Sequence, residues 1–388
     1  MDLSLSEDQK IFYDTVKKFA LNELAEGALE RAYSDDYPWD VAEKFAELGL
    51  LGITIPEEKG GIGGTLMDAV LAIQAVAEVC PRSADVVQAG NFGAVRTFAE
   101  YASDEQRERF LPRILQGKSV MSVGMSEPEA GSAVTELKTT AVEDGDEYVI
   151  NGTKIFGTHS AEAEVFLVYV RFGPGTGGIG SVLVEKGTPG LTVGKPSAFM
   201  NGEHWSQLYF EDCRIPKNNL LLGIGGFKKQ IAGFNVERLG NASRSVAVGR
   251  YAFNLAREHA VTRKQFGRDL CEFQGLQWKF ADMAVKLEAA QLLLMRAVVN
   301  AETALPSAQD TAMAKLACNE AGFFAANESM QVLGGLGFSE ESLAQYCVRR
   351  TRGWMIAGGS IEILKNRVAE GIFERRFSQR PPRTLAAQ

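Results

Sequence analysis

The chain changes its hydrophobic period twice along its 388 residues, and this change limits the possible folds more than any other feature. Up to about residue 118, apolar residues recur at the three- and four-residue spacing of helices. From about 119 the period becomes two, in short runs separated by glycine-rich turns, and from about 227 the helical period returns. We therefore predict an N-terminal all-α domain over 1–118, a β-barrel or β-sandwich domain over 119–226, and a C-terminal four-helix bundle over 227–388.

Local signals place several element boundaries. Ser6 with Gln9, and Ser103 with Gln106, each form a capping box at a predicted helix start. The middle domain is expected to hold strands at 148–156, 165–170, 181–186, 191–194 and 208–210. Four long helical stretches follow, and we predict one helix in each: 227–263, 272–304, 308–333 and 341–375.

Charge and composition exclude several classes of function. The net charge of −8 at pH 7 argues against a nucleic-acid surface, and no stretch approaches the length of an apolar membrane-spanning helix. The three histidines, His159, His204 and His259, have no metal-ligand spacing, so we expect no metal site. The cysteines are widely spaced without a CxxC, and the N-terminus resembles neither a signal nor a transit peptide. We therefore expect reduced thiols in a cytoplasmic protein.

Three glycine-rich segments, GGIGG (60–64), GPGTGGIG (173–180) and GIGG (223–226), invite comparison with dinucleotide-binding loops. That fingerprint must lie between a strand and a helix of a βαβ unit, and none of the three does. We interpret them as turns. A nicotinamide enzyme of the Rossmann kind is therefore a poor alternative.

Four other segments carry a combined signature: SVGMSEPEAGSAVTELKT (122–139), NGTKIFGT (151–158), TRKQFGRDLCEFQGLQWKFADM (262–283) and MQVLGGLGF (330–338). In this order, on a helix–β–helix plan, they resemble the FAD-dependent acyl-CoA dehydrogenase family over nearly the whole chain. The resemblance implies α,β-desaturation of an acyl-CoA thioester and an electron-transfer flavoprotein as partner. It also implies a homotetramer with FAD at a subunit interface, the cofactor supplying the redox chemistry and the protein the positioning.

The same resemblance assigns residues to FAD. Ser126 and the amides around Met125 would bond the pyrimidine edge of the flavin, and Thr158 would lie near its N5 atom. Phe156 stands where the family has a tryptophan beside the ring, with a strand core residue as an equal alternative. Arg263 matches an arginine on the diphosphate, an anion that suits its planar guanidinium. The other matches to cofactor positions are Ser132, which is also expected at the substrate, Phe266, Gln274, Gln331, Gly334, Gly335, Ser360 and Glu362.

The catalytic base needs separate treatment, because removing a proton α to a thioester carbonyl requires a carboxylate in a dry pocket. Many family members carry it in a Glu-Gly-Thr turn near the C-terminus, where this chain has Gly358, Gly359 and Ser360. Isovaleryl- and long-chain acyl-CoA dehydrogenases instead use a glutamate on the long helix, and Glu237 matches that position. A solvated helix carboxylate is the alternative for Glu237.

The surroundings of the thioester follow from the same resemblance. The backbone N–H of Gly358 would still polarise the thioester oxygen, because a glycine at the glutamate position keeps its amide. Arg238 matches the family arginine next to the coenzyme A site, and Asn235 stands where an aspartate often binds pantetheine. Gly359 is expected to contact the substrate.

The segment CPRSADVVQ (80–88) resembles the stretch of glutaryl-CoA dehydrogenase that holds the distal carboxylate of its substrate, and Arg82 matches the anion-binding arginine. A surface arginine at a helix start is the alternative. Desulfinases acting on a sulfinyl-acyl-CoA have a similar arginine and an Ala-Gly-Gly turn, as here at 357–359. A non-redox lyase of an anionic acyl-CoA is therefore a second hypothesis, and a non-catalytic thioester binder a third. The identity of the acyl chain stays open.

Overall fold

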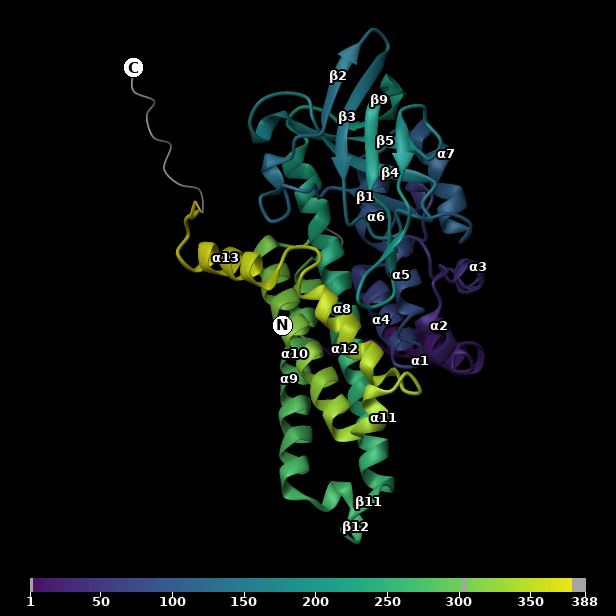
Figure 1. Cartoon of the computed structure of the whole chain (residues 1–388), viewed down its shortest axis with the longest axis vertical. Helices are drawn as coiled ribbons and strands as arrows, with labels where there is room; N and C mark the ends of the chain where they lie inside the picture. The colour runs from purple at the N-terminus through teal and green to yellow at the C-terminus, as the bar shows by residue number, and fades with distance from the viewer. Residues whose placement is uncertain (1–2, 302–304, 379–388) are drawn as a thin grey trace.

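The computed structural model describes residues 3–301 and 305–378 and shows a β domain at one end of the molecule and long helices at the other (Figure 1). Shorter N-terminal helices pack against the side of the long ones. The order of helical, β and helical domains confirms the predicted fold class. The hydrophobic periods predicted this order of domains. A period of three to four residues makes one face of a helix apolar, and a period of two makes one face of a strand apolar.

The N-terminal domain contains, within the described residues, α1 (Glu7–Glu23), α2 (Ala28–Tyr33), α3 (Trp39–Glu47), α4 (Leu66–Ala77), α5 (Ala84–Asn91), α6 (Gly93–Tyr101) and α7 (Asp104–Leu115). Both predicted capping boxes are present, at Ser6 and Ser103, and Thr65 forms another before α4. All of α4 except Asp68 is buried. A helix that is apolar nearly all round must be covered on every side, and α4 packs against α1 and α8.

The β domain is built on a mixed sheet in the spatial order β10–β5–β4–β2–β3–β9–β6, with β1 parallel to β4. These strands are β1 (Met121–Gly124), β2 (Thr140–Asp144), β3 (Glu147–Lys154), β4 (Val165–Arg171), β5 (Ile179–Glu185), β6 (Leu191–Val193), β9 (Leu208–Pro216) and β10 (Leu220–Leu222). A separate pair is formed by β7 (Ser197–Ala198) and β8 (His204–Trp205). Each predicted strand is present, although β3 ends at Lys154 and not at 156, and β9 continues past 210 to Pro216. The strands β1, β2, β7, β8 and β10 were not predicted, because they are short or do not alternate clearly.

The C-terminal domain contains α8 (Phe227–Thr262), α9 (Gln274–Ala301), α10 (Ala308–Leu333), α11 (Gly335–Phe338), α12 (Leu343–Trp354) and α13 (Ile361–Ile372). One long helix over most of 227–263 is confirmed, and the predicted end of the next helix at 304 lies outside the described residues. The prediction of a single helix over 341–375 is wrong. Gly358 and Gly359, with φ of 74° and 96°, break it. The helix α12 ends at Trp354, the two glycines lie in the turn that follows, and Ser360 caps the next helix. A residue with a side chain rarely adopts these angles, which is why glycines occupy the turn.

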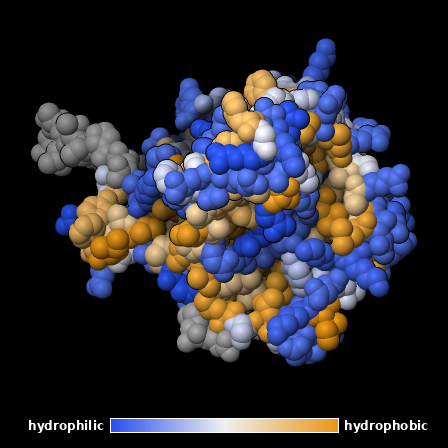
Figure 2. Space-filling view, turned by 90° about the horizontal axis from the view of Figure 1, so that it is seen from below, coloured by the Kyte–Doolittle hydropathy of each residue, from blue (hydrophilic) through white to orange (hydrophobic). Residues whose placement is uncertain are grey.

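The far end of the helical domain is a hairpin between α8 and α9, where β11 (Lys264–Gln265) pairs with β12 (Arg268–Asp269). Short 3₁₀ turns elsewhere cover Glu57–Lys59, Val134–Glu136, Thr176–Gly178, Lys217–Asn219 and Leu270–Glu272. Figure 2 views the molecule from this end and shows orange hydrophobic areas beside blue polar ones. Large apolar side chains exposed on these helices and the hairpin are Val261, Phe266, Trp278, Val285, Leu292, Leu336 and Phe338. Such a concentration is typical of an association surface.

Other sequence expectations concern membranes and thiols. In the part of the chain that the structure describes, no helix is long and apolar enough to span a bilayer. The five cysteines are unpaired, and four of them are buried: Cys80, Cys213, Cys318 and Cys347. Among the described residues, no group of His, Cys, Asp and Glu is arranged to hold a metal ion.

Candidate active site

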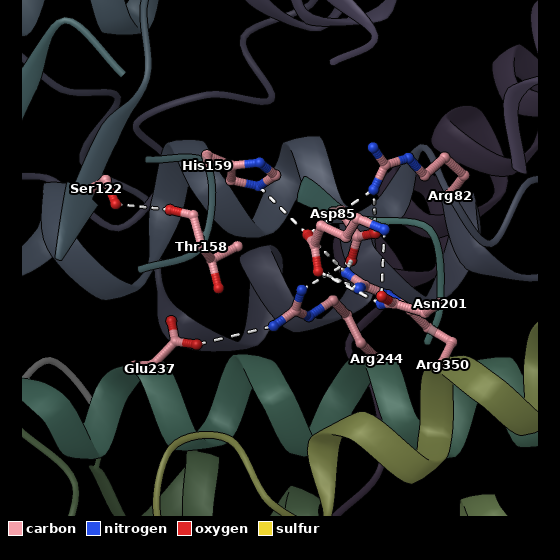
Figure 3. A network of polar contacts seen from close by, with 10 residues as sticks. Arg82, Asp85, Ser122, Thr158, His159, Asn201, Glu237, Arg244 and Arg350 are labelled. Carbon is pink, nitrogen blue, oxygen red and sulfur yellow. Dashed lines mark hydrogen bonds and ion pairs between the residues drawn. The ribbon is translucent and has the colours of Figure 1, made fainter. Parts of the chain in front are cut away.

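Two loops of the β domain bring the predicted flavin-side residues together. The loop after β1 carries Met125 and Ser126, and the loop after β3 carries Phe156 and Thr158. The loops are joined directly, because the Ile155 amide donates to the Ser126 carbonyl at 2.9 Å. A second bond runs from the Ser122 hydroxyl to the Thr158 carbonyl at 2.7 Å (Figure 3). Segments separated along the chain therefore form one edge of a site.

A buried ion pair fixes the base of these loops. Lys154, the last residue of β3, donates to Glu127 at 2.7 Å, and both side chains are buried. Burial lowers the pKa of Lys154 to about 8, while the Glu127 carboxylate opposes that change. Glu127 also accepts the Thr139 amide at 2.9 Å. A buried pair with these additional bonds is costly to break, so it holds the loop after β1 against β3.

Phe156 is not a strand core residue. It follows β3, its side chain is 54 % exposed, and its φ is 58°. His159, on the other side of Thr158, also has a positive φ, of 59°. Left-handed backbone is rare for such residues and concentrates at functional sites. The Phe156 ring packs on Trp205 with centroids 4.6 Å apart, which leaves an aromatic surface open beside Thr158.

Glu237 points from α8 toward the side of Thr158 (Figure 3). Its carboxylate accepts a hydrogen bond from the Gln88 amide of α5. Two glycines make room for this contact. A Cβ at Gly240 would lie 2.0 Å from Gln88 Oε1, and one at Gly93 would lie 2.8 Å from Glu237 Oε2. The backbone is therefore shaped around this carboxylate, and the side chain is partly buried, with 20 % of its surface exposed.

The electrostatics of Glu237 suit a base. Burial raises the pKa of Glu237 above its ordinary value. The main opposing influence is Arg244, whose Nη2 lies 3.8 Å from Glu237 Oε1, and the Gln88 bond and the cations of Lys315 and Arg238 act in the same lowering direction. A carboxylate that is desolvated but kept near a cation can be ionised and still accept a proton.

The turn at Gly358 and Gly359 lies against the helix that carries Glu237. Arg238 Nε donates to the Gly358 carbonyl at 3.0 Å, and Arg238 Nη1 donates to Asn235 at 2.8 Å. The structure therefore brings together the residues that sequence reasoning assigned to the base and to the thioester: Glu237, Arg238, Asn235, Gly358 and Gly359. Ser360 and Glu362 follow in the first turn of α13, where Ser360 accepts from the Ile363 amide.

Arg82 belongs to a buried cluster of charges. Three arginines, Arg82, Arg244 and Arg350, surround Asp85 and Glu203 (Figure 3). Arg350 and Arg244 approach Asp85 to 2.6 and 2.7 Å, whereas Arg82 stays 3.6 Å from Asp85 and 3.8 Å from Glu203. The exposed surface arginine considered as an alternative is therefore wrong, since Arg82 is 6 % exposed.

The ion cluster has more positive than negative charge. Arginine charges lower the pKa of both Asp85 and Glu203, so these two carboxylates are ionised. His159 is neutral, because burial lowers its pKa to about 4. Within the cluster three arginines face two carboxylates, and two further carboxylates lie at its edge. Glu237 lies beside Arg244, and Glu162, whose pKa is raised by burial, interacts with Arg82. A buried unpaired charge is strongly disfavoured, so this balance matters for what the site can bind.

The second group of predicted cofactor residues lies at the far end of the helical domain (Figure 1). Arg263, Phe266 and Gln274 stand at the α8–α9 hairpin, and Gln331, Gly334 and Gly335 at the α10–α11 junction. All six are exposed, and the two places share one apolar cluster containing Ala256, Ala260, Val332 and Leu333. A single chain does not bring this group to the loops of the β domain. Ser132 is exposed on its loop and makes no contact with either group that the described residues show.

Several residues at the site were missed by sequence reasoning: Gln88, Asp85, Glu203, Arg244, Lys315 and Arg350. Gln88 and Asp85 lie inside the segment 80–88 that drew attention through Arg82. The others come from distant parts of the chain and carry no local motif. A buried charged residue on an otherwise apolar helix face, as at Arg244 and Lys315, is the one signal that could have indicated them.

The residues present fit a flavin. The hydroxyls of Ser126 and Thr158 have no partner in the described residues, and Phe156 offers an exposed ring beside them. A Cβ at Gly131, Gly334 or Gly335 would meet nothing within 4 Å. Unbonded polar groups next to an aromatic face match a flat cofactor with a polar edge.

Three family models match the chain in order. Residues 6–118 match the acyl-CoA dehydrogenase N-terminal domain, residues 122–213 the middle domain, and residues 225–373 the C-terminal domain. Together these matches span nearly the whole sequence. They follow the boundaries of the helical, β and helical regions of the structure.

Individual relatives cover the chain almost completely. It is 32 % identical to the 3-sulfinopropanoyl-CoA desulfinase of Paraburkholderia xenovorans, over 97 % of this chain and 98 % of that protein. It is 31 % identical to a short-chain specific acyl-CoA dehydrogenase of Clostridium acetobutylicum, over 96 % of this chain and 100 % of that protein. The solved complex of glutaryl-CoA dehydrogenase with glutaryl-CoA superposes with a TM-score of 0.91 at 26 % identity, covering 98 % of each chain.

Proposed function

Because the chain belongs to the acyl-CoA dehydrogenase family, we propose that it binds FAD and desaturates an acyl-CoA thioester between its α and β carbons, with Glu237 as the base. One observation carries this proposal. Gln88 donates to the Glu237 carboxylate on α8, Arg244 lies 3.8 Å from it, and the neighbouring Arg238 donates to the carbonyl of the Gly358 turn. The turn itself has no carboxylate of its own.

Each step of this reaction is assigned to particular residues of the chain. Glu237 takes the proton from the α carbon, and the Gln88 amide fixes the orientation of its carboxylate. The Gly358 amide polarises the thioester carbonyl, which stabilises the charge that develops on its oxygen. Bound FAD supplies the acceptor for the hydride that leaves the β carbon. The proton, the hydride and the new carbon–carbon double bond account for all atoms and electrons.

The cofactor would be held by two chains. Met125, Ser126, Phe156 and Thr158 contact the flavin ring, and the exposed residues around Arg263 contact the diphosphate and adenosine of a cofactor bound mainly to a neighbouring chain. The exposed apolar helices at this end support a homotetramer. An electron-transfer flavoprotein is the partner that would accept the electrons, by resemblance to the family.

The acyl group that the site favours carries a carboxylate. The excess positive charge of the ion cluster supports this, as do relatives that act on 3-sulfinopropanoyl-CoA or bind glutaryl-CoA. Arg82 is the residue assigned to the anion, because its guanidinium has no direct hydrogen bond to a carboxylate in the described part of the chain. Mass spectrometry of the product formed as a thioester bleaches the flavin would identify the substrate and test the reaction.

A lyase reaction on an anionic acyl-CoA is the second candidate. The similarity to desulfinases, the turn at Gly358 and the buried Arg82 favour it. The environment of Glu237 favours desaturation, because a cleavage without net redox change does not need a shaped base for the α-proton. Steady-state turnover without an electron acceptor would support the lyase. Stoichiometric flavin reduction under anaerobic conditions would support the dehydrogenase.

FAD content should depend on Arg263. The purified protein is expected to be yellow, with about one FAD per chain. Arg263→Ala should weaken FAD retention about 10- to 100-fold, because a charge-assisted contact to the diphosphate is lost. The measurement is flavin absorbance per chain after gel filtration at increasing dilution. Arg268→Ala, in the same hairpin but stacked on Phe273, is the matched control and should retain FAD. Equal retention by all three proteins would remove Arg263 from the cofactor site.

The pH dependence of flavin reduction should respond to Arg244. Glu237 acts ionised, so the rate falls as the pH drops through the pKa of Glu237, which burial has raised. Arg244 lowers that pKa, and Arg244→Met should therefore move the acid limb of the profile to higher pH. Arg250→Met, a partly exposed arginine on the same helix, is the control and should leave the limb in place. A shift to lower pH in Arg244→Met would contradict the assignment of the titrating group.

A further inference from the structure

Lys315 is a buried lysine that the reaction described so far does not use. It lies on α10 and is 0 % exposed. Its ammonium donates to Asn319 Oδ1 at 2.9 Å, to the Trp354 carbonyl at 3.0 Å and to the Gly359 carbonyl at 3.1 Å. These three acceptors satisfy all three N–H donors of the ammonium, yet none of them is charged. Among the described residues Lys315 has no ion pair, and burial lowers the pKa of Lys315 to about 7. A lysine is therefore buried here although all its hydrogen-bond acceptors are neutral.

The acceptors of Lys315 are the end of one helix and the turn that follows it. Trp354 is the last residue of α12, where the helix dipole and unpaired carbonyls favour a cation. Gly359 lies in the turn that separates α12 from α13. Lys315 therefore connects the carbonyl end of α12 to the turn that carries the proposed oxyanion donor.

A second cation holds the neighbouring carbonyl. Arg238 donates to Gly358 at 3.0 Å, while Lys315 donates to Gly359 at 3.1 Å. Two successive peptide groups are thus clamped, one from α8 and one from α10. Two adjacent glycines are the most flexible pair that a chain can have, so a turn built from them needs such external restraint to keep one conformation.

Clamping the carbonyls also sets the direction of the amides. In a planar trans peptide, the carbonyl oxygen and the N–H of the next residue point in opposite directions. The amides of Gly359 and Ser360 are therefore turned away from Arg238 and Lys315, respectively. The Gly358 amide belongs to the preceding peptide, which neither side chain contacts, so the clamp restrains that amide only through the Gly358 Cα that the two peptides share. In the described part of the chain, the amides of Gly358, Gly359 and Ser360 have no acceptor.

Lys315 is also linked to the helix of the base. Its partner Asn319 donates to Asn241 Oδ1 at 3.0 Å, and Asn241 lies one turn after Glu237 on α8. A Cβ on Gly358 would lie 3.4 Å from Lys315 Cε and 4.0 Å from the Asn241 amide nitrogen. The turn, Lys315 and the face of α8 that carries Glu237 are therefore in contact through a continuous set of polar groups.

We propose that Lys315 is a positioning residue for the reaction: it holds the Gly358–Gly359 turn so that its free amides form a preorganised oxyanion site at a fixed place relative to Glu237. This inference rests on the proposed function, since it assigns the turn to the thioester carbonyl. Lys315 itself touches neither the substrate nor the cofactor in this proposal. Its contribution to the oxyanion site is geometric, because oxyanion donors act only when they are aligned with the charge that develops. This role is separate from the lowering of the Glu237 pKa by Lys315, and the carbonyl frequency reports on the first alone.

Lys315→Met is the principal variant, because it keeps the length of the side chain and removes the donors. Three properties separate positioning from a general structural role: the rate of flavin reduction per bound FAD, the dissociation constant of the thioester, and the carbonyl stretching frequency of bound crotonyl-CoA carrying an isotope-labelled carbonyl carbon. Crotonyl-CoA is already unsaturated and reports polarisation without turnover. FAD content and thermal unfolding are measured in parallel.

The expected result for Lys315→Met is a reduction rate about 10- to 1000-fold lower, as found when an oxyanion donor is lost, with little change in thioester binding. The carbonyl frequency should move back toward that of free crotonyl-CoA. Glu237→Gln is the matched control, because it should lose the rate and keep the carbonyl shift. Lys315→Gln, which can still donate to one carbonyl, should lie between wild type and Lys315→Met, and it replaces Lys315→Met if that variant does not fold.

Two outcomes would overturn the proposal. In one, the Lys315 variants keep both the wild-type rate per bound FAD and the carbonyl shift. In the other, they lose FAD or stability while the flavin that remains is reduced at the wild-type rate, which would make Lys315 a folding residue only. Failure of the proposed function is distinct from both, since in that case the wild-type flavin would not be reduced by any thioester.

Discussion

Glu237→Gln should abolish reduction of the flavin by an acyl-CoA thioester while leaving thioester binding largely intact. The amide is nearly isosteric with the carboxylate but cannot accept the α-proton, and loss of a positioned base lowers a rate about 100- to 10,000-fold. Gln88 and Arg244 can still contact the substituted side chain, so the pocket should keep its shape. The measurement is anaerobic stopped-flow bleaching of the flavin, with thioester affinity taken from the spectral change on binding.

Glu258→Gln is the matched control, because Glu258 is an exposed glutamate on the same helix. It should reduce its flavin at the wild-type rate. If Glu237→Gln also retains that rate, Glu237 is not the base, and either another carboxylate or the lyase reaction must be considered. Loss of thioester binding together with the rate would instead indicate that Glu237 shapes the pocket.

The double variant Glu237→Gln, Gly358→Glu tests whether a carboxylate at the turn can replace the one on α8. In the family, both positions address the same carbon, so some activity should return. The structure limits how much, because Gly358 has a φ of 74° and a Cβ there would lie 3.4 Å from Lys315 Cε. A left-handed conformation costs about 1–2 kcal/mol for a residue with a side chain, so the rescue is expected to be small.

The sequence predicted the order of helical, β and helical regions because that order depends on local pattern, whereas the residues around Glu237 were assigned through the family resemblance. Hydrophobic periods report which face of an element is buried, and capping boxes such as that at Ser103 are satisfied within a few residues. The break at Gly358 was missed for a similar local reason, since helical spacing continues on both sides of it. The family resemblance indicated a turn at these glycines, and their two positive φ values confirm it.

The polar partners of the base could not be predicted in the same way. Gln88 reaches Glu237 only because Gly240 and Gly93 lack side chains, and that complementarity exists only between packed helices. Arg82 precedes α5, and its two carboxylate partners come from α5 and from a loop of the β domain. Arg350, which contacts the same carboxylates, comes from α12. Charge balance in a buried cluster is a property of the assembled fold, and no periodicity records it.

The preference for a terminal carboxylate should be the property of the site most sensitive to Arg82. An arginine that pairs with a substrate carboxylate away from water is worth about 2–4 kcal/mol when one partner is removed, or about 30- to 1000-fold in specificity. We expect the wild type to prefer succinyl- or glutaryl-type thioesters over neutral thioesters of matched shape, such as 4-methylpentanoyl- and 5-methylhexanoyl-CoA. Arg82→Met should lose that preference, as measured by kcat/KM for each pair.

A second variant of the same cluster, Asp85→Asn, should change the preference for a carboxylate in the opposite direction to Arg82→Met. Arg82→Met removes one of three positive charges, whereas Asp85→Asn removes one of two negative charges around the same guanidinium groups. Asp85→Asn should therefore strengthen the preference for a carboxylate, although it disturbs the same buried contacts. Damage to the fold would lower kcat/KM for both thioesters of a pair in both variants. It would not change the ratio of anionic to neutral kcat/KM in opposite directions in the two variants.

The same balance explains why an anionic substrate would suit this base. When Glu237 accepts the α-proton, Arg244 loses the carboxylate that lies 3.8 Å from it, and the cluster keeps an unbalanced positive charge. A substrate carboxylate held nearby compensates that charge as it appears, so it stabilises the state formed by proton transfer more than the ground state. The advantage of an anionic thioester over a neutral one should therefore be larger when the rates of flavin reduction are compared than when the dissociation constants are compared. Equal use of anionic and neutral thioesters by the wild type would discard this account and leave a neutral acyl-CoA as the substrate.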